Sequence, residues 1–190
     1  LLASPRYGEK WGRLWLDLAR YADTAGENSD HPLPHAWRYR DWVIDAFNRN
    51  VPYDRFVQLQ IAGDLLAGDA DPDAYADGVV ATGFLALARR FGHDIDQDVH
   101  LTYEDAIDTM GKAVLGLTLA CARCHDHKFD PISQKDYYRL ASALSGVGHG
   151  ERALPDARRE SQLVQARKKR SEAEAALEAL EAPARKAVLA

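Results

Sequence analysis

The chain is poor in sulfur, because its 190 residues include only two cysteines and one methionine. The two cysteines, Cys121 and Cys124, stand three positions apart, so a disulfide between them would restrain little of the unfolded chain. A scaffold held together by disulfides is therefore excluded. At this length a hydrophobic core can bury well over half of the unfolded surface, so such a scaffold is not required. The spacing of the thiols points to chemistry instead.

Long apolar runs are also absent, and no segment approaches the roughly 20 residues needed to cross a bilayer. The sequence thus predicts no transmembrane segment in this chain. A net charge of −5 excludes a general affinity for nucleic acid or anionic membrane. Because the chain begins at Leu1 without a leader-like segment, we expect it to be part of a longer protein.

Apolar residues recur at three- and four-residue steps, and no convincing alternating strand pattern occurs. Helices are predicted for approximate ranges that begin or end at prolines, glycines and capping residues: 5–21, 37–47, 53–66, 72–87, 102–119 and 134–144. From residue 156 a charged helix follows, with an interruption at Pro183. The sequence predicts an all-α fold: an irregular multi-helix domain with long loops over 4–150, and a charged helical arm over 151–190 that leads to a C-terminal domain.

The segment Cys121-Ala122-Arg123-Cys124-His125 has the C-x-x-C-H spacing of haem c attachment. Two thiols three residues apart can reach the two vinyl groups on one edge of a porphyrin. The imidazole of His125 then follows as the proximal ligand of the iron. The motif predicts one covalently attached haem c.

Two other chemistries use similar residues and stay open at this point. A C-x-x-C pair also serves thiol–disulfide exchange, where a thiolate of lowered pKa is needed. Cys121, Cys124, His125 and His127 together have the composition of a two-Cys, two-His zinc site. The adjacency of Cys124 and His125 is awkward for a tetrahedral site, which favours haem.

The motif also lies within a longer recognisable sequence. Residues 121–132 read CARCHDHKFDPI and are followed by Asp136-Tyr137-Tyr138, which resembles the planctomycete-type cytochrome c domain family, long catalogued as a domain of unknown function. The resemblance extends over most of residues 4–145, through Pro5–Gly8, Trp15–Asp17, Ala19–Asp23, Trp37–Trp42, Pro52–Asp54, Ala62–Asp64, Ala81–Phe84 and Leu115–Thr118.

That resemblance implies a c-type haem, export across the inner membrane to the periplasm, and a partner domain further along the same polypeptide. It does not give the reaction, the redox partner or the catalytic residues. Our first hypothesis is therefore a haem-bearing module that relays electrons within a larger exported oxidoreductase. A structural or scaffolding module with a zinc-bound or empty Cys–His site is the alternative from another class.

The distal ligand of the iron is the main unknown of the haem hypothesis. Met110 is expected to be core packing, because eleven residues of one straight helix, about 16 Å, would separate it from Cys121. His149, His31 and His35 are the remaining distal candidates, and a five-coordinate iron is the alternative. His127, Lys128 and Asp130 are expected around the haem rather than on its iron.

Two acidic groups suggest further sites. Asp94, Asp96 and Asp98 alternate as in a calcium loop, but Val99 follows where such a loop needs glycine, so a solvated acidic loop is favoured. Seven charged residues interleave with the tryptophans, and we expect Arg–carboxylate pairs joining two helices: Asp17, Arg20, Asp23, Arg38, Arg40, Asp41 and Asp45. Catalysis on a polysaccharide-derived substrate through Asp17 or Asp23 is the competing interpretation.

Overall fold

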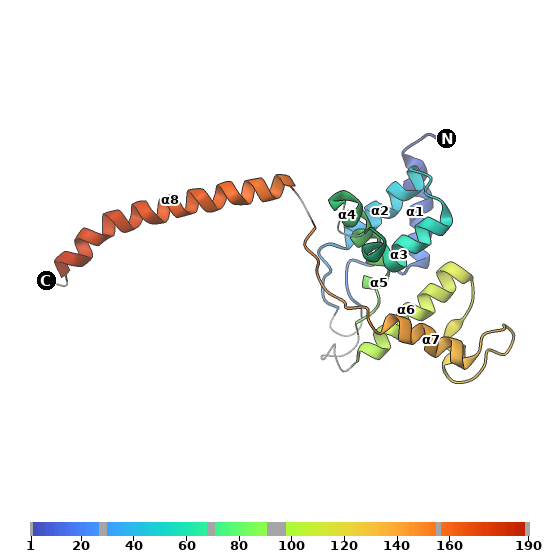
Figure 1. The fold of residues 1–190 in the computed structure, drawn as a ribbon. Coiled ribbons are helices and arrows are strands. Elements are labelled where there is room, and N and C mark those ends of the chain that lie inside the picture. The colour runs from blue at the N-terminus through green and yellow to red at the C-terminus, as the bar shows by residue number, and fades with distance from the viewer. Residues whose placement is uncertain (1, 27–29, 68–70, 91–97, 155–156, 189–190) are drawn as a thin grey trace. The chain divides into compact units, whose positions relative to one another are not determined.

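The structure is a computed structural model that describes residues 2–26, 30–67, 71–90, 98–154 and 157–188. The chain divides into two compact units, residues 1–153 and residues 154–190 (Figure 1). The described residues contain helices and one isolated β-bridge, between Thr24 and Pro32, but no strand. The predicted all-α fold is confirmed.

Unit 1 is built from short helices. In chain order these are α1 (Arg6–Leu18), α2 (Ala36–Asn48), α3 (Tyr53–Ala67), α4 (Pro72–Ala81), α5 (Gly83–Ala86), α6 (Val99–Met110), the π-helix η1 (Gly111–Leu115), the 3-10 helix η2 (Leu119–Arg123) and α7 (Gln134–Leu144). Unit 2 contains the single long helix α8 (Ala157–Val188). The predicted interruption at Pro183 is wrong, because α8 continues past this residue although proline lacks the N–H that a helix interior uses.

Aromatic side chains from α1, α2 and α3 form the centre of the core. The ring of Phe56 stacks on Trp42 with centroids 5.4 Å apart and meets Trp15 edge-on at 4.9 Å. Trp15 Nε1 lies 3.0 Å from both Tyr39 Oη and Gln60 Oε1, which pairs these polar groups inside the core. Helices α1, α2 and α3 therefore pack against one another through their own aromatic residues.

Helices α3 and α4 touch at two glycines, Gly63 and Gly78. A Cβ atom added to either residue would collide with the backbone carbonyl of the other. Only glycine allows this crossing, because any side chain would push the two helices apart.

Two helix starts agree with the capping signals of the sequence. Asp71 accepts hydrogen bonds from the amides of Asp73 and Ala74, which fixes the start of α4. Ser133 and Asp136 form a reciprocal capping box at the start of α7. This second cap matters for the site, because α7 begins directly after the C-x-x-C-H segment.

The predicted helix over 102–119 is wrong in both boundaries. Helix α6 begins at Val99, and Thr102, where the predicted helix began, is buried within it. After Met110 it passes into the π-helix η1, which is capped by Gly116, whose φ of 68° is left-handed and suits glycine. Met110 and Cys121 are therefore not on one straight helix, but Met110 is 7% exposed and packs in the core, as expected.

Candidate haem-attachment site

The C-x-x-C-H segment lies on the short turn of η2, ahead of α7. Cys121 lies within η2 and Cys124 ends it. Both thiols are exposed and neither forms a disulfide. Ala122, between them, is fully buried and joins the core. The turn is therefore fixed from beneath by Ala122 while both thiols stay accessible.

Backbone contacts tie the motif to α7. The carbonyl of Arg123 accepts hydrogen bonds from Gln134 Nε2 at 3.0 Å and from the Tyr138 hydroxyl at 3.2 Å. Asp126 Oδ1 accepts the Gln134 amide at 2.8 Å, at the N-terminus of α7, where negative charge is favoured. The motif thus has a fixed position relative to this helix.

The side chain of Arg123 ties the motif to α6 as well. Its guanidinium pairs with Glu104 on that helix. A hydrogen bond to Cys124 and the charge of Glu104 both raise the pKa of Arg123. Arg123 therefore places a positive charge beside the second thiol of the motif.

His125 is exposed and its ring has a defined hydrogen bond. Its Nδ1 lies 2.7 Å from the carbonyl oxygen of Asp126. Because a carbonyl only accepts, Nδ1 carries the proton and Nε2 keeps its lone pair. A histidine that binds a metal through one nitrogen commonly donates the other N–H to a carbonyl in this way. The tautomer of His125 therefore fits an iron ligand.

His127, by contrast, holds the loop that follows the motif. Its side chain is only 7% exposed. Its Nδ1 accepts the amides of Asp130 at 2.9 Å and Phe129 at 3.3 Å, so this nitrogen is unprotonated. The Asp130 carboxylate is also 3.1 Å from Nδ1, but an ion pair there would require a protonated Nδ1 that could not accept the two amides. Nε2 is left to donate to Thr118 Oγ1 at 3.2 Å.

The different contacts of the two histidines predict different effects on folding. His127→Ala leaves two backbone amides without their acceptor and should lower the free energy of unfolding by about 2 kcal/mol. His125→Ala removes an exposed ring with one local contact and should change it by less than about 0.5 kcal/mol. Urea unfolding of the haem-free chain measures both. Equal losses would contradict the assigned roles.

Exposed apolar side chains, which a porphyrin would require, occur on the segments that precede and follow the motif in the chain. Leu115 on η1 is 57% exposed, Tyr138 on α7 is 52% exposed and Phe129 in the loop is 83% exposed. Lys128 Nζ lies 5.1 Å from the centre of the Phe129 ring. Two accessible thiols, an imidazole with a lone pair at Nε2 and adjoining apolar groups fit a covalently attached haem.

The zinc set considered from the sequence is not assembled. Both ring nitrogens of His127 are engaged, Nδ1 by amides of its own loop and Nε2 by Thr118, so this residue has no lone pair for a metal. Within the described ranges, no three His, Cys, Asp or Glu side chains are grouped so as to hold a metal ion.

His149, a predicted distal ligand, lies at the other end of α7 from the motif. The motif contacts the first turn of this helix, whose 11 residues span about 16 Å. His149 follows its last turn, and Nε2 donates to the carbonyl of Leu85 at 3.2 Å. Burial and the charges of Arg90 and Arg20 lower the pKa of His149.

This lowered pKa predicts a pH dependence of stability. The unfolded chain binds a proton at His149 near pH 6.5 and the folded chain only below that, so stability should fall as pH drops below 6.5 through the lowered pKa. His149→Gln keeps a donor for Leu85 without a titrating group, and should flatten this part of the profile. His100→Gln, at an exposed histidine, is the matched control and should leave the slope unchanged.

The other two distal candidates, His31 and His35, are exposed in the segment between α1 and α2. Within this segment, the Ala25 carbonyl accepts a hydrogen bond from the Arg90 amide at 3.3 Å. Figure 1 shows the blue segment before α2 and the yellow loop before α7 on opposite sides of unit 1. The described structure therefore brings neither histidine to His125.

The proposed calcium loop lies mostly outside the described residues. Asp94 and Asp96 belong to the undescribed range 91–97. Asp98 precedes α6, and its carbonyl accepts the Leu101 amide.

The expected net of charge pairs between α1 and α2 is wrong. Arg40 pairs with Asp41, and Asp45 pairs with Arg49, within or at the end of α2 itself. Arg20 turns instead to α6, where its Nε lies 2.7 Å from Asp105. The helical periodicity gave no indication of this contact, because Arg20 follows the end of α1 with a left-handed φ of 52°.

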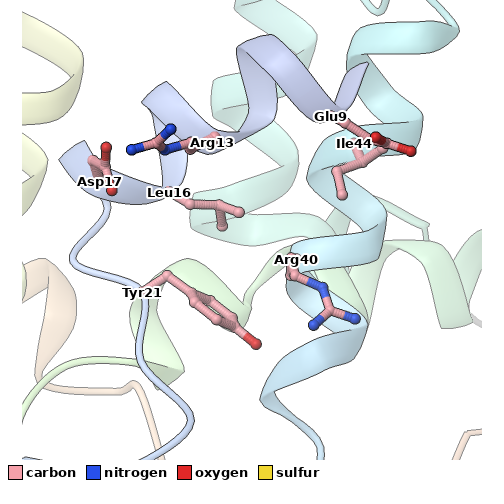
Figure 2. Close-up of a pocket in the computed structure, with 7 residues that line it drawn as sticks. All are labelled: Glu9, Arg13, Leu16, Asp17, Tyr21, Arg40 and Ile44. Atoms are coloured by element: carbon pink, nitrogen blue, oxygen red, sulfur yellow. The ribbon is translucent and has the colours of Figure 1, made fainter. Parts of the chain in front are cut away.

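A separate hollow of about 330 Å³ lies between α1 and α2. Figure 2 shows the residues that line it: Glu9, Arg13, Leu16, Asp17, Tyr21, Arg40 and Ile44. The Tyr21 hydroxyl donates to Asp23 at 2.6 Å. Burial is the larger cause and this hydrogen bond the smaller one that together raise the pKa of Tyr21 to about 12. Of the two proposed catalytic carboxylates, Asp17 lines the hollow and Asp23 is engaged by Tyr21.

The fold and the site together define a small all-α domain that presents an anchored C-x-x-C-H segment on its surface. The chain belongs to the PSCyt2 family, described as a protein of unknown function (DUF1549), whose family model matches residues 1–149. The resemblance stated from the motifs is thereby confirmed. No curated protein and no solved structure matches the chain. The helices of the described ranges do not include one of the length and apolarity needed to cross a membrane.

Proposed function

We propose that this chain is a haem c-binding electron-transfer module of a larger exported oxidoreductase. The observation that supports it most directly is the side chain of His125, whose Nδ1 is engaged by the Asp126 carbonyl while Nε2 keeps a lone pair. The two accessible thiols of Cys121 and Cys124 precede it. The cytochrome in the family's name agrees with this proposal.

Each residue has a separate role in the proposal. Cys121 and Cys124 form the covalent bonds to the porphyrin, and His125 binds the iron. A bound haem supplies a one-electron redox couple. Asp126 orients the His125 ring, and His127 keeps the following loop in place. Arg123 holds the second thiol in position through its contact with Glu104 on α6.

The wider setting is also part of the proposal. Export follows from the C-x-x-C-H chemistry, since we expect haem attachment to take place in the periplasm. The electron partner is proposed to be the C-terminal domain of the same polypeptide or a separate redox protein. The PSCyt2 match ends at residue 149, so the charged helix after it lies outside the matched region.

The test is to produce the chain behind a secretion signal together with a periplasmic haem-attachment system. We expect a mass above the 21.1 kDa polypeptide by one haem, and a Soret band that survives acid–acetone extraction. Reduction and reoxidation should shift the visible bands reversibly. A mass equal to that of the polypeptide, with both thiols open to alkylation, would end the proposal.

A further inference from the structure

Helix α8 has a regular seam along one side, made of small and apolar residues and one arginine. Its members alternate at three- and four-residue steps, the spacing of positions a and d in a coiled coil. We call this set the α8 seam: Leu163, Ala166, Arg170, Ala173, Leu177 and Leu180. Leu163 is 43% exposed, Leu177 55% and Leu180 77%, so the three leucines lie at the surface of the chain.

Contacts within α8 alone contribute little to its stability. Salt bridges link successive turns, among them Lys168–Glu172 at 4.0 Å and Arg170–Glu174 at 3.3 Å. Exposed pairs of this kind each contribute only about 0.3–0.5 kcal/mol. Helices in proteins gain most of their stability by packing an apolar side against another element. The α8 seam is such a side.

The charges of α8 define which partner fits and in which direction. Residues 157–170 hold six basic residues and one acidic residue, whereas residues 171–188 hold four acidic and two basic residues. A second α8 running in the opposite direction places each basic half against an acidic half. A parallel copy would place the two basic halves side by side and the Arg170 side chains opposite each other, which is unfavourable.

One antiparallel register satisfies the whole seam. It places Leu163 opposite Leu180 of the second copy, Ala166 opposite Leu177, and Arg170 opposite the small Ala173. The long Arg170 side chain can then extend past alanine to solvent. The same register places Arg167 near Glu174 of the second copy, a contact that the two-fold symmetry of the pair repeats. We propose that α8 pairs with α8 of a second copy of this chain as an antiparallel two-helix coiled coil.

The first test measures the mass of the whole chain in solution by light scattering. We expect a concentration-dependent dimer of twice 21.1 kDa. Leu177→Lys, in the seam, should weaken dimerisation at least about tenfold. Val164→Lys is the matched control, because Val164 is equally exposed, at 59%, but lies off the seam, and it should leave the dimer intact. A monomer at all concentrations, or equal effects of both variants, would overturn the proposal.

The second test measures orientation by crosslinking, in a Cys121→Ser/Cys124→Ser background. The antiparallel register predicts efficient disulfide dimers when Leu163→Cys and Leu180→Cys are combined, and few with either substitution alone. Efficient crosslinking through Leu163→Cys alone would show a parallel pair and would contradict the charge argument. Absence of disulfide dimers from the combined variant would equally overturn the proposal.

Discussion

Replacing both Cys121 and Cys124 by serine is expected to abolish covalent haem attachment completely. Serine has no thiol to form a thioether, so all haem in the product should be removed by acid–acetone. The fold should not change, because both cysteines are exposed and neither forms a disulfide. A surface substitution of this kind alters the free energy of unfolding by less than about 0.5 kcal/mol. The measurement is the Soret absorbance of the polypeptide after extraction, together with its intact mass.

The single variants provide the control for this experiment. Cys121→Ser and Cys124→Ser each keep one thiol and should yield a smaller amount of protein with one thioether bond. Circular dichroism should give the same helix content for all three variants. Haem retained by the double variant after extraction would show that other groups hold it, and would refute the assignment of these thiols.

Removing the carboxylate of Asp105 should cause a large loss of stability in the scaffold. Arg20 is only 18% exposed at its side chain and Asp105 16%, and they meet at 2.7 Å between the end of α1 and α6. Asp105 also accepts the Arg89 amide at 2.9 Å. Asp105→Asn leaves the Arg20 charge without its counter-ion, so we expect a loss of about 3 kcal/mol in urea unfolding.

Asp108→Asn, one turn further along α6, is the matched control. Asp108 pairs with Lys112, whose side chain is 56% exposed, so its removal should cost less than about 1 kcal/mol. The double variant Arg20→Met/Asp105→Leu should recover part of the stability, because it removes both charges together but leaves the Arg89 amide without its acceptor. Equal losses for Asp105→Asn and Asp108→Asn would contradict the importance of burial at Asp105.

Local sequence signals predicted much of the fold and the centre of the site. The caps at Asp71 and Ser133 depend on side chains that bind amides two or three residues away, so they can be read from the sequence directly. The C-x-x-C-H spacing is equally local. The family resemblance then covered most of unit 1, and the family match confirms it.

Contacts between distant segments could not be predicted in this way. The pair Arg20–Asp105 joins residues 85 positions apart, and nothing in their neighbours indicates it. The end of η1, which continues α6, depends on the left-handed conformation of Gly116, whereas the apolar period continues beyond it and suggested a longer helix. The role of His127 depends on a loop that folds back to present two amides, which its sequence did not reveal.

The two residues between the cysteines differ in how freely they can be varied. Ala122 has no exposed surface, so a larger side chain there would have to enter a packed interior or lift the turn away from it. Arg123 is exposed, and its charge meets Glu104 at the surface. Substitutions at residue 123 should therefore remove only the surface contact with Glu104, whereas residue 122 should accept only a side chain as small as alanine.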